Sequence, residues 1–150
     1  MPEVYRAPMR SRRDDIDLKP TIDRALAMGH VGFGDAGGTG VDDRLERRVT
    51  RFGEVADGSF VWTRDTDGLY WLGRIEGPLF YDDAGAAVDL VHVRPCRWTA
   101  APVLEPEVPP AVLATFARGG RNFQQTHDAD VGEQSAAIWR KRENGSAIRS

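Results

Sequence analysis

The chain has 150 residues, of which 41% are hydrophobic and 29% are charged. This length fits one compact domain, and the composition excludes a collagen-like or wholly disordered chain. The formal net charge is −3, so attraction to a polyanion must come from a local basic patch. No apolar run reaches the roughly 18 residues of a membrane span, and residues 1–13 lack the apolar stretch of a secretory signal. We therefore expect a cytoplasmic protein without a membrane partner.

Two residue types narrow the chemistry further. Cys96 is the only cysteine, which excludes an internal disulfide and a cysteine-based zinc site within one chain. Lysine supplies only Lys19 and Lys141 of the 20 cations, so arginine carries almost all of the positive charge. GC-rich coding explains this bias, and a guanidinium fork also suits bidentate contacts with phosphates or bases.

The first third of the chain predicts two helices around a short strand. Pro20 fits the first turn of a helix that Gly29 ends, and residues 30–34 alternate like a strand. A glycine-rich loop follows, and apolar residues at helical spacing over residues 41–52 predict the second helix. Its acidic residues stand at the start and its arginines toward the end, as the helix dipole favours.

Residues 58–101 predict an antiparallel meander. Aromatic and β-branched runs at 59–64, 69–76, 79–81, 88–94 and 96–99 are separated by turn residues, including a turn at 65–68. Pro95 implies a bend or an edge position between the last two strands. Residues 102–110 contain four prolines and predict an extended connector.

Two more helices are expected after the connector, over residues 110–116 and 131–142, the second with Ile138 and Trp139 as candidate anchors. The pattern as a whole predicts the α+β class: a small curled antiparallel or mixed β-barrel flanked by helices.

Catalytic motifs are weak in this sequence. Residues 32–37 fit the dinucleotide pattern G-x-G-x-x-G, but hairpins follow it where alternating strands and helices are required. A metal nuclease needs clustered carboxylates with a lysine at a strand end, and both lysines stand in or beside predicted helices. The three histidines lack metal-ligand spacing, and neither Ser59 nor Cys96 has the surroundings of an activated nucleophile. We expect a non-catalytic protein without a cofactor or a metal.

The predicted sheet is rich in aromatic residues, namely Phe60, Trp62, Tyr70, Trp71, Phe80, Tyr81 and Trp98. The period of two places Phe60 and Trp62 on one face with Arg64, and makes Tyr70 and Trp71 point to opposite faces. Aromatic residues are ordinary contents of a small barrel, but one set can also line a slot for a flat ring. An extruded nucleobase is such a ring.

Several motifs follow one another in a characteristic order: residues 27–34 (AMGHVGFG), 58–64 (GSFVWTR), 72–77 (LGRIEG), 92–98 (HVRPCRW) and 116–125 (FARGGRNFQQ). Together, in this order, they resemble the EVE-like and YTH-like branch of the PUA superfamily. The match spans residues 18–128, which leaves a basic N-terminal arm at 1–17 and a C-terminal helix and tail at 129–150. The resemblance implies a PUA-like mixed barrel whose aromatic pocket holds a flipped, methylated base.

This resemblance leads to a hypothesis for the base pocket. We expect Phe33 and Trp62 to stack on the ring and Tyr81 or Tyr70 to close the pocket. A common form of the family motif has Trp where this chain has Asp35. A carboxylate there can accept a hydrogen bond from the amine of cytosine, which favours 5-methylcytosine over 6-methyladenine. A solvated turn residue is the alternative interpretation of Asp35.

Two arginine groups are candidates for phosphate contacts. Arg44, Arg47, Arg48 and Arg51 form a basic sector on the second predicted helix, and Arg118 and Arg121 flank Gly119-Gly120. Phosphate contacts set position while a base pocket supplies specificity. A solvated helix face explains the first group equally well.

The sequence therefore predicts a non-catalytic reader of methylated double-stranded DNA that is associated with the nucleoid and restricts foreign DNA, with a nuclease or other effector protein as a further partner. The alternatives are a reader of 6-methyladenine or of modified RNA, an adaptor that recruits a protein through the proline connector or Trp139, and a small-molecule enzyme that uses the glycine loop.

Overall fold

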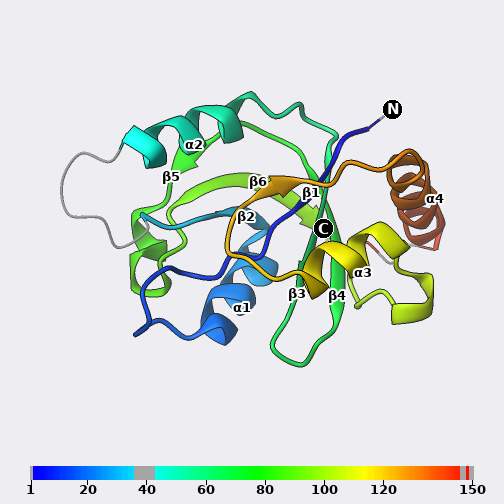
Figure 1. Cartoon of the computed structure of the whole chain (residues 1–150), viewed down its shortest axis with the longest axis horizontal. Coiled ribbons are helices and arrows are strands. Elements are labelled where there is room, and N and C mark those ends of the chain that lie inside the picture. Colours follow the sequence, from blue (N-terminus) through cyan, green and yellow to red (C-terminus); the bar gives the residue numbers. More distant parts are fainter. Residues whose placement is uncertain (1, 36–42, 146–147, 149–150) are drawn as a thin grey trace.

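The computed structural model describes residues 2–35, 43–145 and 148. Its strands are β1 (Val4–Arg6), β2 (His30–Phe33), β3 (Phe60–Arg64), β4 (Tyr70–Ile75), β5 (Phe80–Tyr81), β6 (His92–Trp98) and β7 (Gln124–Gln125). Its helices are α1 (Leu18–Met28), α2 (Asp43–Glu54), α3 (Pro110–Ala117) and α4 (Val131–Asn144), with two short 3₁₀ helices, η1 (Asp83–Val88) and η2 (Glu105–Glu107). The described strands form one curled sheet in the order β2-β6-β4-β3-β1-β7, with β5 paired to β6 (Figure 1). The expected α+β class, a small curled sheet flanked by helices, is confirmed.

The first two helices begin and end for the expected local reasons. Helix α1 has Pro20 in its first turn and ends at Gly29, whose φ of 69° is left-handed and whose N–H donates to the carbonyl of Ala25. Helix α2 has Asp43 in its first turn and Arg51 in its last, which complements the helix dipole. Both helices pack against the same face of the sheet.

The hairpin of β3 and β4 also forms as predicted. The carboxylate of Asp65 accepts hydrogen bonds from the backbone N–H groups of Asp67 and Leu69, each at 2.9 Å. Gly68 supplies the positive φ of 81° that this turn requires. The hairpin pairs Phe60 with Arg74 and Arg64 with Tyr70.

The two strands expected on either side of Pro95 form one strand, β6, and Pro95 has the expected edge position on one side only. On one edge of β6, Pro95 pairs with His30 of β2. On the other edge, β5 pairs with residues 92–93 and β4 pairs with residues 96–98. Pro95 stands between these two ladders, so its missing N–H falls at a local gap and the strand continues.

The prediction of an N-terminal arm over residues 1–17 is also corrected. Strand β1 lies inside the sheet, parallel to β3 on one side and antiparallel to β7 on the other. Val4 is fully buried there, and its register partner is Phe60. A strand of three residues is too short to show a period in the sequence, and its pairing with β3 joins segments more than 50 residues apart.

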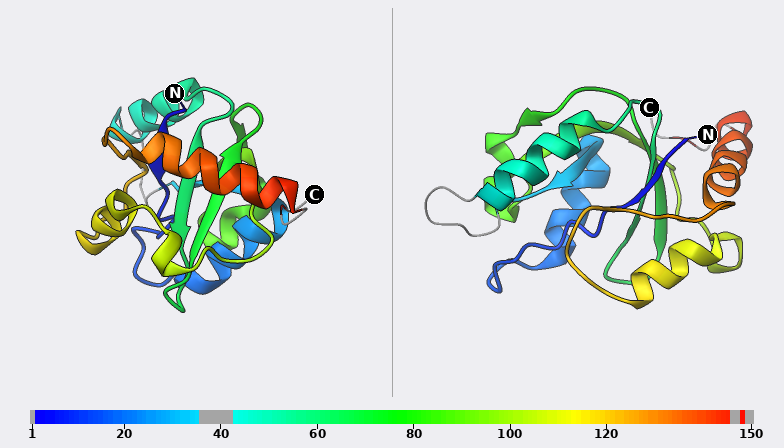
Figure 2. Two further views of the ribbon diagram at one scale, coloured as in Figure 1. Left: turned by 90° about the vertical axis from the view of Figure 1, so that its right-hand side faces the viewer. Right: turned by 45° about the horizontal axis from the view of Figure 1, so that its top comes forward.

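The sheet is buried on both faces. One core lies against α1 and α2 and includes Val61 of β3, whereas the other lies against α3 and α4 and includes Phe60 and Trp62 of the same strand. Figure 2 shows α4 crossing the sheet over β3 and β4. Trp139 of α4 is 2% exposed in the second core, so the helix expected over residues 131–142 is part of the packed body.

Candidate functional site

The five residues expected to form one base pocket lie in separate places. Phe33 belongs to the core beneath α1 and α2, whereas Trp62 and Tyr70 belong to the core beneath α3 and α4. Strands β2 and β3, which carry Phe33 and Trp62, are separated in the sheet by β6 and β4. A base stacked on Phe33 therefore cannot also contact Trp62. The predicted convergence of these rings is wrong, because motif order along the chain does not determine strand order in the sheet.

Trp62 and Tyr70 are structural residues. Trp62 is 1% exposed, and its indole N–H donates to Oγ of Ser135 in α4 at 3.0 Å. The ring of Tyr70 meets that of Phe116 edge to face at 5.7 Å, and the guanidinium of Arg64 lies 5.6 Å from its centroid. Both aromatic rings are buried in the core beneath α3 and α4.

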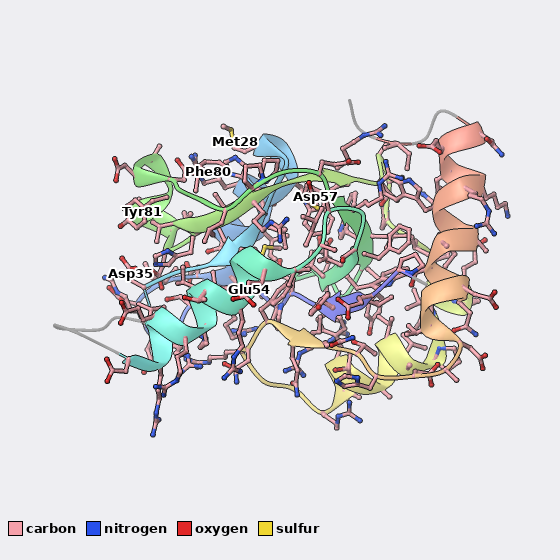
Figure 3. The ribbon with its side chains drawn as sticks, turned by 90° about the horizontal axis from the view of Figure 1, so that it is seen from above. Met28, Asp35, Glu54, Asp57, Phe80 and Tyr81 are labelled. Carbon is pink, nitrogen blue, oxygen red and sulfur yellow. The ribbon has the colours of Figure 1, made fainter. Side chains whose placement is uncertain are left out.

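Asp35 and Tyr81 do come together, at the open end of β2. One carboxylate oxygen of Asp35 lies 2.5 Å from Nε2 of His92, and the other accepts a hydrogen bond from the Tyr81 hydroxyl at 3.2 Å. Figure 3 shows the two labelled side chains on the same side of the molecule. The negative charge of Asp35, followed by partial burial and the hydrogen bond, raises the pKa of Tyr81 above its ordinary value of 10.0. Asp35 thus has two side-chain partners within the protein, while its own side chain is 48% exposed.

A cavity of about 320 Å³ lies on the α2 side of the sheet, and Phe33 is in its wall. We call it the aromatic pocket; its lining residues are Tyr5, Phe33, Arg48, Arg51, Phe52, Val55, Phe123, Gln124 and Gln125. The volume is at the lower end of the roughly 300–1,000 Å³ range of small-molecule sites. The pocket combines aromatic walls with two arginines and two amides, which suits a single flat, polar ring.

The aromatic side chains of this pocket contact one another in sequence. Tyr5 and Phe123 are stacked at 4.9 Å, Phe123 meets Phe52 at 4.8 Å, and Phe52 meets Phe33 at 5.2 Å. The guanidinium of Arg48 lies 4.8 Å from the Phe33 centroid. Burial, reinforced by a hydrogen bond to Glu3, raises the pKa of Tyr5 to about 12. The tyrosine is consequently neutral at physiological pH.

Local structure explains how these residues meet. Arg48, Arg51 and Phe52 project from one side of α2, because residues three and four apart share a helix face. Tyr5 of β1 pairs with Gln125 of β7, and Phe123 directly precedes β7. The aromatic pocket therefore lies between α2 and the β1–β7 edge of the sheet.

Arg94 fixes the end of α2 over this edge. Its side chain is buried and donates to the carbonyl of Phe52 at 2.9 Å, to that of Gly77 at 2.9 Å and to the carboxylate of Asp57 at 2.7 Å. Asp57 is labelled beside the end of α2 in Figure 3. This arginine joins β6 to the segment after α2 and so holds Phe52 in the wall of the pocket.

The predicted phosphate-binding arginines do not lie at one site. Arg48 and Arg51 line the aromatic pocket. Arg47 lines a shallow hollow on α2 together with Asp43 and Glu46, whose charges offset it, and Arg44 is exposed on the same helix. Arg118 caps α3, and Arg121 lines a separate cavity beside Gly119 and Gly120.

The sequence analysis does not identify six of the pocket residues as site residues: Tyr5, Phe52, Val55, Phe123, Gln124 and Gln125. Strands β1 and β7 are three and two residues long, so neither shows a periodic signal. The segment 116–125 resembles a family motif, but its sequence does not indicate which of its side chains face a cavity.

Within the described residues, no group of three His, Cys, Asp or Glu side chains is arranged to hold a metal ion. Burial raises the pKa of the Cys96 thiol well above its ordinary value. None of the described helices has both the length and the apolar character needed to cross a membrane. In comparisons with protein-family models, curated proteins and solved structures, we found no match to this chain. The resemblance to EVE-like and YTH-like domains stays a prediction.

Proposed function

We propose that the protein is a non-catalytic reader of modified DNA that holds one base, swung out of the duplex, in the aromatic pocket. The observation that carries this proposal is the pocket itself: a cavity of about 320 Å³ with Phe33 and Phe123 in its walls and Arg48 and Arg51 beside them. Stacking on aromatic side chains is worth about 1–3 kcal/mol per base, which helps to offset the few kcal/mol that base extrusion costs.

The two amides of the pocket suit the edge of cytosine. Oε1 of Gln124 accepts a hydrogen bond from Arg6 at 2.8 Å, which directs that amide's N–H groups elsewhere as donors. Nε2 of Gln125 donates to Glu3 at 3.4 Å, which leaves its carbonyl oxygen as an acceptor. A carbonyl acceptor and an amide donor are the groups that complement the amine and ring nitrogen of cytosine. In this proposal the carbonyl of Gln125, and not the carboxylate of Asp35, accepts the hydrogen bond from the amine. The Asp35 carboxylate already contacts His92 and Tyr81.

The expected selectivity for 5-methylcytosine is small. Burial of one methyl group is worth about 0.8 kcal/mol, or about a fourfold preference over cytosine. Phosphate contacts by Arg48 and Arg51 add affinity that does not depend on the base.

Fluorescence polarisation with matched duplexes tests the proposal. The duplexes are unmodified, 5-methylcytosine-containing and 6-methyladenine-containing, and a single-stranded RNA of the same sequence is the fourth probe. We expect the tightest binding to the 5-methylcytosine duplex. Tighter binding to the RNA or to the 6-methyladenine duplex would identify that probe as the ligand. Equal affinity for all four probes would refute base reading.

A matched pair of variants tests the site. Phe123→Ala removes an aromatic wall, and Phe80→Ala removes an exposed ring outside the pocket. We expect Phe123→Ala to weaken binding about 5- to 150-fold, the equivalent of one lost stacking contact, with Phe80→Ala unchanged. Circular dichroism shows whether both variants are folded. Equal binding by two folded variants would exclude the aromatic pocket as the binding site.

A further inference from the structure

A cavity of about 480 Å³ lies apart from the aromatic pocket, between the segment after β1, the β3–β4 turn and the loop after α3. Four arginines line it: Arg6, Arg10, Arg64 and Arg121. We call it the arginine pocket. Phe116 and Leu18 add apolar wall, and Gly119 and Gly120 add backbone.

The one carboxylate among its described lining residues, that of Asp65, offsets only part of the charge of these four arginines. Asp65 uses one oxygen to accept the backbone N–H groups of Asp67 and Leu69, and the other to accept the indole N–H of Trp71 at 2.9 Å. All three bonds lie within the β3–β4 hairpin. The acidic side chain thus shapes the turn, and the cavity keeps an excess of positive charge.

Arg6 anchors this charge inside the protein. It is 5% exposed, and its guanidinium donates to the carbonyls of Thr115 at 3.1 Å and Gly119 at 2.8 Å and to Oε1 of Gln124 at 2.8 Å. Its described hydrogen-bond partners are all neutral. A buried guanidinium without a carboxylate partner makes the cavity favourable for an anion.

The other three arginines are weakly engaged. Arg64 lies over the Tyr70 ring at 5.6 Å, and Arg121 is 3.8 Å from Asp14, a side chain that is 96% exposed. Arg10 is exposed. Exposed pairs of this kind contribute little, so these guanidinium groups are available to a ligand.

We propose that the arginine pocket binds backbone phosphates of the same DNA strand that places its base in the aromatic pocket. The link between the two cavities is Gln124, which lines the aromatic pocket and accepts a hydrogen bond from Arg6 of the arginine pocket. Guanidinium forks match phosphate oxygens in bidentate geometry. This inference rests on the proposed function and adds the surface along which the strand lies.

The test measures how binding of the 5-methylcytosine duplex and its unmodified counterpart depends on salt. The variant Arg10→Ala/Arg64→Ala removes two exposed charges from the pocket, and Arg10→Ala/Arg121→Ala is a second, independent pair. The control is Arg140→Ala, an exposed arginine on α4 outside the pocket. Each lost phosphate contact lowers the slope of log K against log salt by about 0.9. We expect a decrease of about 1–2 in both double variants and none in the control.

The possible outcomes separate this inference from the proposed function. If the slope is unchanged and the preference for 5-methylcytosine is retained, the arginine pocket does not bind phosphates. The proposed base reading would not be affected. A reduced slope without any preference between the duplexes would support the pocket and overturn base reading. A wild-type protein that binds neither duplex would overturn both.

Discussion

The carboxylate of Asp35 lies 2.5 Å from Nε2 of His92 and accepts a hydrogen bond from the hydroxyl of Tyr81. The Tyr81 ring in turn meets the His92 ring edge to face at 5.3 Å. The three residues come from the end of β2, from β5 and from β6, so the cluster joins three strands at one end of the sheet. Its first role is to hold these strand ends together.

Replacement of Asp35 is expected to change the titration of Tyr81. The carboxylate is the main cause that raises the pKa of Tyr81, so Asp35→Asn should bring that pKa back toward 10.0. NMR of tyrosine-labelled protein over alkaline pH measures the shift, and Tyr81→Phe identifies the resonance. Tyr5, whose pKa is about 12, should titrate alike in both proteins. An unchanged Tyr81 titration in Asp35→Asn would show that the cluster does not form in solution.

Trp62 should behave as a core residue and not as part of a ligand cage. Trp62→Phe removes ring volume and the hydrogen bond to Ser135, and we expect a loss of about 1–3 kcal/mol in the free energy of unfolding. Trp71→Phe is the comparison variant: it also removes an indole hydrogen bond, to Asp65, but from a half-buried ring, so we expect a smaller loss. Urea unfolding measures the free energy of unfolding of both variants. A Trp62→Phe variant with full stability but lost DNA affinity would restore the sequence-based assignment.

Much of the fold was predictable because its signals are local. Gly29 ends α1, the turn at 65–68 joins β3 to β4, and alternation along β3 places Phe60 and Trp62 on one face, as expected. The parallel pairing of Val4 with Phe60 was not predictable, because no short-range pattern records it. The continuity of β6 through Pro95 was not predictable for a related reason. A strand tolerates a proline where its neighbours leave a gap, and that gap depends on where β4 and β5 end.

The candidate site was only partly predictable. Phe33, Arg48 and Arg51 were named from the sequence, and the structure places all three in the aromatic pocket. Trp62 was grouped with Phe33 because both stand in noticeable motifs, but the sheet order separates them. Chemistry-bearing residue types are visible in a sequence, whereas their grouping depends on long-range strand pairing.

His30 should make the protein less stable in mild acid. Its Nδ1 lies 3.6 Å from Asp82, which favours the charged ring, but burial is the larger influence and, with the charge of Arg24, lowers the pKa of His30 below its ordinary 6.5. The unfolded chain therefore binds a proton that the folded chain resists. The free energy of unfolding carries no penalty from His30 above pH 6.5. It decreases as the pH falls from 6.5 toward the lower pKa of His30 in the folded protein.

Urea unfolding at about pH 7.5 and about pH 5.5 measures this effect, since histidine is the side chain that ordinarily titrates in this interval. Wild type should lose stability between the two values, and His30→Gln should lose less. The control His127→Gln replaces an exposed histidine and should follow wild type. The same pH dependence in all three proteins would contradict the prediction.

Arg6 is expected to need its guanidinium geometry as well as its charge. Lysine at this position keeps the charge but cannot reach Thr115, Gly119 and Gln124 with a planar fork. Because buried carbonyls left without donors cost about 1–3 kcal/mol, Arg6→Lys should lower the free energy of unfolding by about that amount. The exposed Arg10→Lys is the control and should change stability by less than about 0.5 kcal/mol. Urea unfolding compares the two variants, and equal stability would show that the Arg6 hydrogen bonds do not hold the loop after α3.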